Sequence, residues 1–401
     1  MAQVRKGTIG ILPAGALGVS LFFHLTRGLS RIDGDVFFIE RSGSTSGELL
    51  RQQKFLRVAV PATAAPGDAE SETTPTTAIG LVPAREILKG DLLECFEKNG
   101  LPEILLICPN PDQLLSVITT IVALLEKISQ RGELQDDASP LPIMVLSSNG
   151  IYFQRVRQIF VEKLEEATLF GRLPDLWPDL MPKIVGRLLR GITIQTGIRE
   201  GSGAETIYHP GARGITRLAG GDKKVREYCC AILAGRGAWF ELAEHESPTR
   251  LEFDKAIVNL AANFLGQLYA IDDAGDFRLL TVEQILADEH QAAIEELAAR
   301  VFEVGKSVKA YHASERFETI LQNFWGTVRV HASHIPSSLQ WLNLLLRQKK
   351  LKPQLTPTEA WLIDPLIRYA RSAHLEEASE YFQKLKQRLI RKLELAIRRA
   401  D

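Results

Sequence analysis

The sequence has little cysteine, no long apolar run and no excess of either charge. Its 401 residues include four cysteines, and none of them forms a CxxC pair. The spacing of Cys95, Cys108, Cys229 and Cys230 offers neither a disulfide framework nor a readable metal site. We therefore expect reduced thiols and no bound metal. The apolar stretches at residues 117–125 and 257–265 are too short to cross a membrane.

Charged residues are nearly balanced, with 48 lysines and arginines against 49 aspartates and glutamates. A net charge of -1 lacks the long-range attraction that nucleic acid or an anionic membrane requires, so we expect neither as a partner. The first apolar run is short and soon becomes rich in glycine, unlike a signal peptide. Together with the cysteine usage, this predicts a cytoplasmic protein.

The first forty residues predict a βαβ unit. Residues 8–12 are apolar, 13–18 form a glycine-containing turn, 19–29 have helical apolar spacing and 36–39 are a second apolar run. Further apolar runs at 104–108, 142–146 and 191–195 alternate with helical patterns. We therefore predict an α/β fold in which residues 1–222 form a Rossmann-type parallel sheet covered by helices on both faces.

The second part of the chain, residues 223–401, has a helical pattern nearly to its end and predicts an all-α C-terminal domain. Two segments of the first domain look like insertions. Residues 61–78 lack large apolar side chains and predict a mobile surface loop, and residues 165–190 predict a helical insertion.

The turn after the first strand has the position of a dinucleotide-binding turn. Gly15 would let a pyrophosphate approach the backbone, and Gly18 would let the helix pack closely on the strand. Pro13 stands where the GxGxxG pattern has its first glycine, and it removes an N–H. A tight βα turn without a nucleotide therefore remains the alternative. The turn consists of Pro13, Ala14, Gly15, Ala16, Leu17 and Gly18.

Glu40 and Arg41 follow the second predicted strand. A carboxylate at this place bonds the ribose of NAD, whereas an arginine meets the 2′-phosphate of NADP. In the register that we prefer, Arg41 takes the phosphate-contacting place, which favours NADPH and leaves NADH possible. The alternative is that both residues are exposed charges at a strand end.

A polar stripe runs along the apolar helix predicted at residues 253–265. Lys255, Asn259 and Asn263 recur at i, i+4 and i+8 and therefore share one face. Polar groups on a buried helix are costly unless something satisfies them, so the stripe should line a cleft that holds substrate or water. A narrow face in contact with solvent is the alternative. Lysine can protonate an oxygen during hydride transfer, and asparagine can orient a hydroxyl or carbonyl.

These segments resemble the ketopantoate reductase family, within the dehydrogenases whose C-terminal domain is like that of 6-phosphogluconate dehydrogenase. The resemblance implies an oxidoreductase that reduces a 2-keto acid with NADPH, as 2-dehydropantoate 2-reductase does in pantothenate biosynthesis. It allows a homodimer. The matching segments are residues 13–18, 148–150, 206–216, the Lys–Asn–Asn stripe, 334–340 and 358–364.

The resemblance also implies a role for each matching residue. Lys255 would be the general acid, and Glu359 would position Lys255 or the substrate. Asn259, Asn263 and Ser337 would hold substrate oxygens, and Asn149 would lie between cofactor and substrate. The implied cofactor-binding residues are the turn residues Pro13 to Gly18, Arg41, Asn110, Gln113 and Asn149.

Three departures from the family pattern keep other functions open. Pro13 replaces a glycine, Asn110 replaces a lysine near the cofactor, and Ser148 replaces a glutamine. A catalytically weak regulatory or scaffold protein with a Rossmann fold is one alternative. A dehydrogenase for another hydroxy acid, or for an opine-type substrate, is the other.

Overall fold

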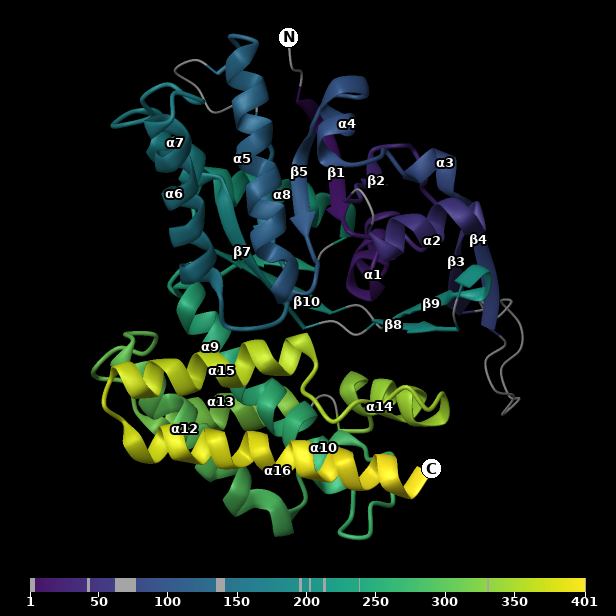
Figure 1. The fold of residues 1–401 in the computed structure, drawn as a ribbon, viewed down its shortest axis with the longest axis vertical. Coiled ribbons are helices and arrows are strands. Elements are labelled where there is room, and N and C mark those ends of the chain that lie inside the picture. The colour runs from purple at the N-terminus through teal and green to yellow at the C-terminus, as the bar shows by residue number, and fades with distance from the viewer. Residues whose placement is uncertain are drawn as a thin grey trace. The chain divides into compact units, whose positions relative to one another are not determined.

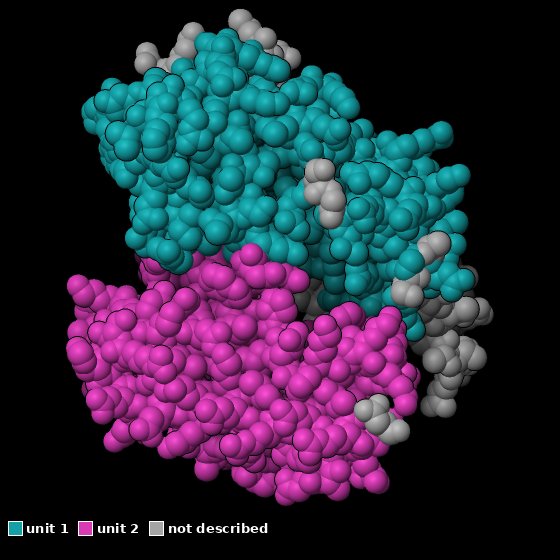
Figure 2. All heavy atoms as spheres, in the orientation of Figure 1, with its two compact units in different colours: residues 1–109, 113–148, 155–244 teal, residues 110–112, 149–154, 245–401 magenta. Residues whose placement is uncertain are grey.

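The computed structural model of the chain forms two compact units (Figure 2). Unit 1 comprises residues 1–109, 113–148 and 155–244, and unit 2 comprises residues 110–112, 149–154 and 245–401. The structure describes residues 4–41, 44–61, 77–134, 141–194, 197–201, 203–211, 214–237, 239–329 and 332–400.

A seven-stranded sheet forms the centre of unit 1, in the order β11-β10-β7-β6-β5-β1-β2. Figure 1 shows β5, β1 and β2 side by side in this sheet. All neighbours are parallel except β10 and β7. The strand order reverses beside β1, which is where open α/β sheets bind ligands. The predicted α/β class is confirmed. The strands are β1 (Arg5–Leu12), β2 (Val36–Phe38), β5 (Pro102–Ile107), β6 (Ile143–Leu146), β7 (Leu188–Ile194), β10 (Ile215–Ala219) and β11 (Phe240–Leu242).

Continuous apolar runs explain why the central strands lie inside. Every residue of β5 and β6 is buried, as expected for parallel strands with helices on both faces. The helices of unit 1 are α1 (Ala16–Leu25), α2 (Thr45–Gln53), α3 (Ala84–Ile87), α4 (Leu92–Lys98), α5 (Leu114–Gln130), α6 (Phe153–Leu169), α7 (Leu180–Gly186) and α8 (Lys223–Gly237). The predicted insertion at 165–190 consists of the end of α6, the short α7 and the start of β7.

The observed units divide later than residue 222. Strand β11 extends the sheet of unit 1 beside β10, and α8 leads into β11. The helical pattern of α8 carries no information about which unit it covers, so the sequence analysis assigned it to the second domain. The structure groups residues 223–244 with unit 1.

A second sheet of four strands, in the order β4-β3-β9-β8, packs beside α1. It joins distant segments, since Val58 of β3 pairs with Tyr208 of β9. The strands are β3 (Phe55–Pro61), β4 (Thr77–Pro83), β8 (Gly197–Glu200) and β9 (Ile207–Pro210). The surface loop predicted at 61–78 lies mostly outside the described residues. Its first residue belongs to β3, and its last two belong to β4.

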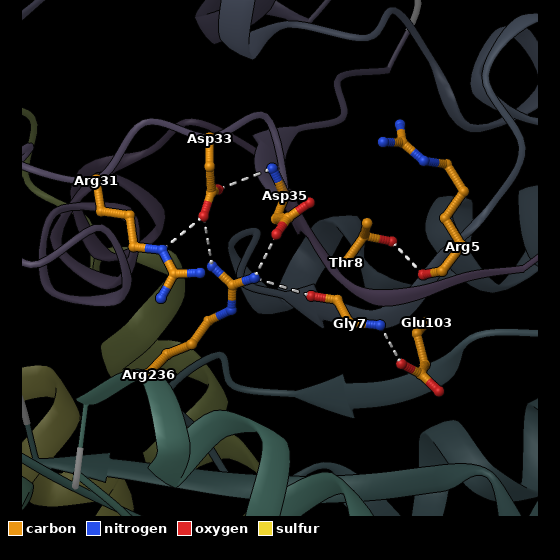
Figure 3. A network of polar contacts seen from close by, with 8 residues as sticks. All are labelled: Arg5, Gly7, Thr8, Arg31, Asp33, Asp35, Glu103 and Arg236. Carbon is orange, nitrogen blue, oxygen red and sulfur yellow. Dashed lines mark hydrogen bonds and ion pairs between the residues drawn. The ribbon is translucent and has the colours of Figure 1, made fainter.

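A polar network joins the end of α8 to the first residues of β1 and to the loop before β2 (Figure 3). The Arg236 guanidinium donates to the Gly7 carbonyl at 3.1 Å and to Asp35 at 2.9 Å, and it lies 3.6 Å from Asp33. The Gly7 N–H in turn donates to Glu103 at 2.6 Å. The network therefore ties the C-terminal end of α8 to the strand starts of unit 1.

Unit 2 is built from helices around an apolar core that includes Phe253, Phe264 and Phe382. The predicted helical C-terminal part is confirmed. Its helices are α9 (Pro248–Asn259), the π-helix η3 (Leu260–Leu265), α10 (Gly266–Ala270), α11 (Val282–Ile285), α12 (Gln291–Ser307), α13 (Phe317–Arg329), α14 (Ser337–Arg347), α15 (Pro357–Ser372) and α16 (Glu376–Ala400).

The cysteines carry free thiols. Burial raises the pKa of Cys95 to about 11 and that of Cys108 to about 12, so these two thiols remain protonated at neutral pH. Within the described ranges, no group of three or more His, Cys, Asp or Glu side chains could hold a metal ion. In the same part of the chain, no helix combines the length and the apolar character needed to cross a membrane.

Candidate active site

The turn between β1 and α1 leaves room for phosphate groups. A Cβ on Gly15 would meet no heavy atom within 4 Å, whereas a Cβ on Gly18 would lie 2.1 Å from the Pro13 carbonyl oxygen. Gly18 is therefore required by close packing, and Gly15 faces open space. Gly15 is also the N-cap of α1, and no side chain caps this helix start in the described structure. Exposed helix N–H groups beside an open glycine fit a dinucleotide pyrophosphate.

Glu40 lies fully buried beneath this turn. Its Oε1 accepts the Ala14 N–H at 2.7 Å, and its Oε2 accepts the hydroxyls of Ser44 at 2.8 Å and Ser46 at 2.9 Å. Burial raises the pKa of Glu40, and these hydrogen bonds oppose the rise. At the next peptide, the buried Tyr208 hydroxyl donates to the Ala14 carbonyl at 3.0 Å. Glu40 therefore holds the turn, and its carboxylate is committed to contacts within unit 1.

Of the other proposed cofactor residues, Arg41 and Asn110 lie in loops, and Gln113 ends the 3-10 helix η1 (Pro111–Gln113). Arg41 is half-buried and directly follows Glu40, Asn110 is exposed, and Gln113 is half-buried directly before α5. Their roles towards a cofactor stay predictions. Ser148, which replaces the family's glutamine, is buried and donates to the Pro109 carbonyl at 2.6 Å. This bond ties together the loops that follow β5 and β6.

In unit 2, Lys255 and Asn149 come together. The Lys255 ammonium donates to Asn149 Oδ1 at 2.6 Å. The backbone after Asn149 requires glycine, because Gly150 has a φ of 127° and a Cβ there would lie 3.1 Å from Trp361 Cβ. The sequence analysis selected both Lys255 and Asn149, from segments more than a hundred residues apart.

Glu252 positions the segment that carries Asn149. Its buried carboxylate accepts the backbone N–H groups of Tyr152 at 3.2 Å and Phe153 at 3.1 Å. Glu252 lies one helical turn before Lys255 on α9, so the helix that presents the ammonium also fixes the opposing loop. Sequence reasoning missed Glu252, because a glutamate within a helix carries no signal that distinguishes it from a solvated charge.

The polar stripe continues beyond Asn263. Lys255, Asn259 and Asn263 are all half-buried on a largely buried helix, where Asp254 and Val258 are half-buried as well. Asn263 Nδ2 lies 3.5 Å from Asn259 Oδ1, and the Gln267 amide donates to the Asn263 carbonyl at 3.2 Å. Gln267 stands four residues after Asn263, so extending the same spacing by one step would have found it. Asn263 belongs to the π-helix η3, a feature that is frequent at functional sites.

Ser338 contacts this stripe directly. Its hydroxyl donates to Asn263 Oδ1 at 3.0 Å and lies 3.3 Å from the Asn263 carbonyl. The sequence analysis selected the preceding residue, Ser337, which is the half-buried first residue of α14. The two serines were indistinguishable from the sequence, because a helix start orients consecutive side chains about 100° apart.

Glu359 joins the stripe through a hydrogen bond with Gln267. Its buried carboxylate accepts a hydrogen bond from the Gln267 amide and another from the Thr356 N–H at 2.8 Å, within a capping box. Among the described residues, no hydrogen bond links Glu359 to Lys255 directly, and the role of Glu359 towards Lys255 or the substrate stays a prediction. Burial raises the pKa of Glu359, while the bonds from Gln267 and Thr356 oppose the rise.

The arrangement offers one cation and a row of amides. The ammonium of Lys255 is a proton donor, and the carboxamides of Asn149, Asn259 and Asn263 carry donors and acceptors that can orient a hydroxyl, carbonyl or carboxylate. Gln267 and Glu359 fix Asn263 from the buried side. Such a set can bind a small oxygen-rich molecule and give a proton to one of its oxygens.

Comparison with solved structures finds the same fold at low sequence identity. D-mandelate dehydrogenase in a ternary structure with NADH and anilino(oxo)acetate has a TM-score of 0.61 at 14% identity, covering 96% of this chain and 98% of that chain. The 2-dehydropantoate 2-reductase from Porphyromonas gingivalis W83 has a TM-score of 0.54 at 12% identity, covering 96% and 99%. The dimeric ketopantoate reductase from Staphylococcus aureus has a TM-score of 0.53 at 12% identity, covering 95% and 99%.

Sequence comparison adds no assignment: no protein-family model matches the chain, and no curated protein matches it. The structural likeness extends over nearly the whole chain and confirms the resemblance at the level of the fold. The chain therefore has the fold shared by ketopantoate reductases and D-mandelate dehydrogenase.

Proposed function

We propose that this protein is an NADPH-dependent reductase of a small 2-keto acid, of the kind that ketopantoate reductases represent. The observation that supports it best is the 2.6 Å hydrogen bond from Lys255 to Asn149, at the head of a stripe of amides. An oxidoreductase of this type needs a proton donor and a polar surface for substrate oxygens, and unit 2 supplies both.

The turn of residues 13–18 would hold the dinucleotide in unit 1. The open space at Gly15 and the uncapped start of α1 support binding of the pyrophosphate. Glu40 and Tyr208 hold the two peptide groups on either side of the Ala14 Cα, which lowers the entropy lost on binding. Because these contacts occupy the Glu40 carboxylate, Arg41 is the described side chain at the end of β2 that would meet the 2′-phosphate of NADPH.

The chemistry divides between cofactor and protein. A bound nicotinamide would supply the hydride to the carbonyl carbon. Lys255 would donate its proton to the carbonyl oxygen, which yields the hydroxy acid. Asn259 and Asn263 would orient the substrate oxygens, with Ser337 beside them, and Asn149 would hold the Lys255 ammonium in place.

Titration with NADPH and NADH, followed by turnover with a panel of 2-keto acids, tests this proposal. We expect tighter binding of NADPH than of NADH, and turnover with at least one keto acid. Arg41→Ala should weaken NADPH binding and leave NADH binding nearly unchanged. Arg85→Ala, an exposed arginine on α3, is the matched control and should change neither. A wild-type chain that binds neither cofactor would overturn the proposal.

A second candidate is an NADH-linked dehydrogenase of another hydroxy acid. It is favoured by the likeness to D-mandelate dehydrogenase, whose structure holds NADH and which has the higher TM-score of the structures compared. Preference for NADH, with turnover of an aromatic keto acid, would select this candidate. Cofactor binding without turnover of any keto acid would instead select the regulatory or scaffold role.

A further inference from the structure

We propose that unit 1 contains a separate pocket for a small oxyanion-bearing molecule, held by Arg27 and Trp239. The pocket, called here the α1–α8 pocket, is lined by His24, Arg27, Gly28, residues 234–237 and Trp239. Its volume is about 460 Å³, which lies within the range of small-molecule sites, about 300–1,000 Å³. It lies at the C-terminal end of α1, whereas the turn at Gly15 lies at the start of this ten-residue helix, about 15 Å away.

A buried donor without a partner marks the wall of this pocket. The side chain of Trp239 is 2% exposed, and its indole N–H has no hydrogen-bond partner in the described structure. A Cβ on Gly237 would lie 3.6 Å from this nitrogen, so the indole N–H lies close to the pocket wall that Gly237 forms. Buried indole N–H groups normally find an acceptor. The nitrogen is enclosed beside Gly237, so an oxygen of a bound molecule would supply the acceptor after a small movement of this part of the pocket wall.

Two glycines line the pocket at positions where neither the backbone conformation nor the packing requires a glycine. Gly235 and Gly237 occupy the last turn of α8, where glycine weakens a helix relative to alanine. Neither has a positive φ. A Cβ on Gly235 would meet no heavy atom within 4 Å, and one on Gly237 would make only ordinary contacts of 3.5 Å or more. Side chains at these positions would instead reduce the space of the pocket, which points to an occupant.

The charged groups among the described lining residues are cationic, and no aspartate or glutamate is found among these residues. Arg236 is held in place by Asp33 and Asp35 (Figure 3). Arg27 is exposed, and among the described residues no carboxylate lies within ion-pairing distance of its guanidinium. A guanidinium binds carboxylate and phosphate oxygens through paired N–H donors, which defines the ligand class.

The backbone at residues 27–29 and the C-terminal ends of α1 and α8 also affect whether the pocket binds an anion. Arg27, Gly28 and Leu29 have consecutive φ values of 52°, 69° and 70°, a conformation that is costly for the two residues with side chains and common at binding sites. The partial negative charge at the helix ends opposes an anion. However, the terminal α1 carbonyls of Phe22 and His24 already accept backbone N–H groups, and the full charge of Arg27 faces the pocket.

The test follows the indole N–H of Trp239 by NMR in the full chain, with its signal assigned by its loss in Trp239→Phe. Inorganic phosphate and malonate are the two probes, and sodium chloride at equal ionic strength is the control salt. We expect a saturable shift of this signal with phosphate, malonate or both, and none with chloride. The probe that saturates identifies a phosphate or a carboxylate ligand.

Three variants decide the assignment. Arg27→Gln should weaken probe binding about tenfold or more, and Gly235→Ala should abolish it while keeping or raising the melting temperature. Arg85→Gln, on α3, should bind as the wild type does. The proposal is overturned if neither probe gives a saturable shift, or if Arg27→Gln and Gly235→Ala bind the probe as tightly as the wild type.

Discussion

Replacing Glu40 by alanine removes the buried carboxylate on which the turn before α1 rests. The buried Ala14 N–H would lose its acceptor, which costs about 1–3 kcal/mol. The hydroxyls of Ser44 and Ser46 would lose an acceptor as well, at about 0.5–1.5 kcal/mol each where no other partner is in reach. Relief of the burial that raises the pKa of Glu40 offsets part of this loss. We expect the free energy of unfolding to fall by about 2–4 kcal/mol.

Urea unfolding of the full chain, followed by circular dichroism, measures this loss. Glu48→Ala removes an exposed carboxylate from α2 and is the matched control, with an expected change of less than about 0.5 kcal/mol. Glu40→Gln keeps one oxygen for the Ala14 N–H and should lose less stability than Glu40→Ala. If Glu40→Ala unfolds at the same urea concentration as the wild type, the buried carboxylate does not support the turn before α1.

Two further predictions concern the turn and the buried end of the stripe. Gly15→Ala should keep its stability and weaken NADPH binding, because its Cβ enters open space, whereas Gly18→Ala should lose stability, because its Cβ would lie 2.1 Å from the Pro13 oxygen. Calorimetric melting with cofactor titration separates the two variants, and equal melting temperatures would contradict this account. Burial raises the pKa of Glu359 above its ordinary value of 4.5, so the fold favours the protonated carboxyl. The wild type should therefore lose stability relative to Glu359→Gln as pH rises above 4.5 through the raised pKa, by at most about 1.4 kcal/mol per pH unit. Urea unfolding of both proteins between about pH 4 and about pH 8 checks this sign, and a difference that does not vary with pH would contradict it.

The sequence predicts those parts of the fold that depend on local periodicity. Short apolar runs predicted the parallel strands, and the helical spacing of residues 253–265 predicted the stripe that contains Lys255. The second sheet could not be predicted, because its pairing of Val58 with Tyr208 links segments that have no local signal for one another. The assignment of α8 to unit 1 depends on tertiary packing in the same way.

The candidate site was likewise predictable only in part from the sequence. Lys255 and Asn149 were selected by motif and lie within hydrogen-bonding distance. The role of Glu40 was not recoverable, because a carboxylate at a strand end is equally compatible with a ribose contact and with a buried bond to the turn. Thr356 followed by Glu359 three residues later is the sequence signature of a capping box. In the structure, the Glu359 carboxylate accepts the Thr356 N–H within this capping box.

Steady-state turnover of Lys255→Ala shows whether this lysine is the proton donor. We expect kcat to fall by about 100-fold or more, since general acid catalysis contributes about that much, while the dissociation constant for NADPH stays near the wild-type value. Lys384→Ala, which removes an exposed lysine from α16, should retain full turnover. Wild-type turnover in Lys255→Ala, with the keto acid that the wild type reduces, would contradict the assignment of this lysine as the proton donor.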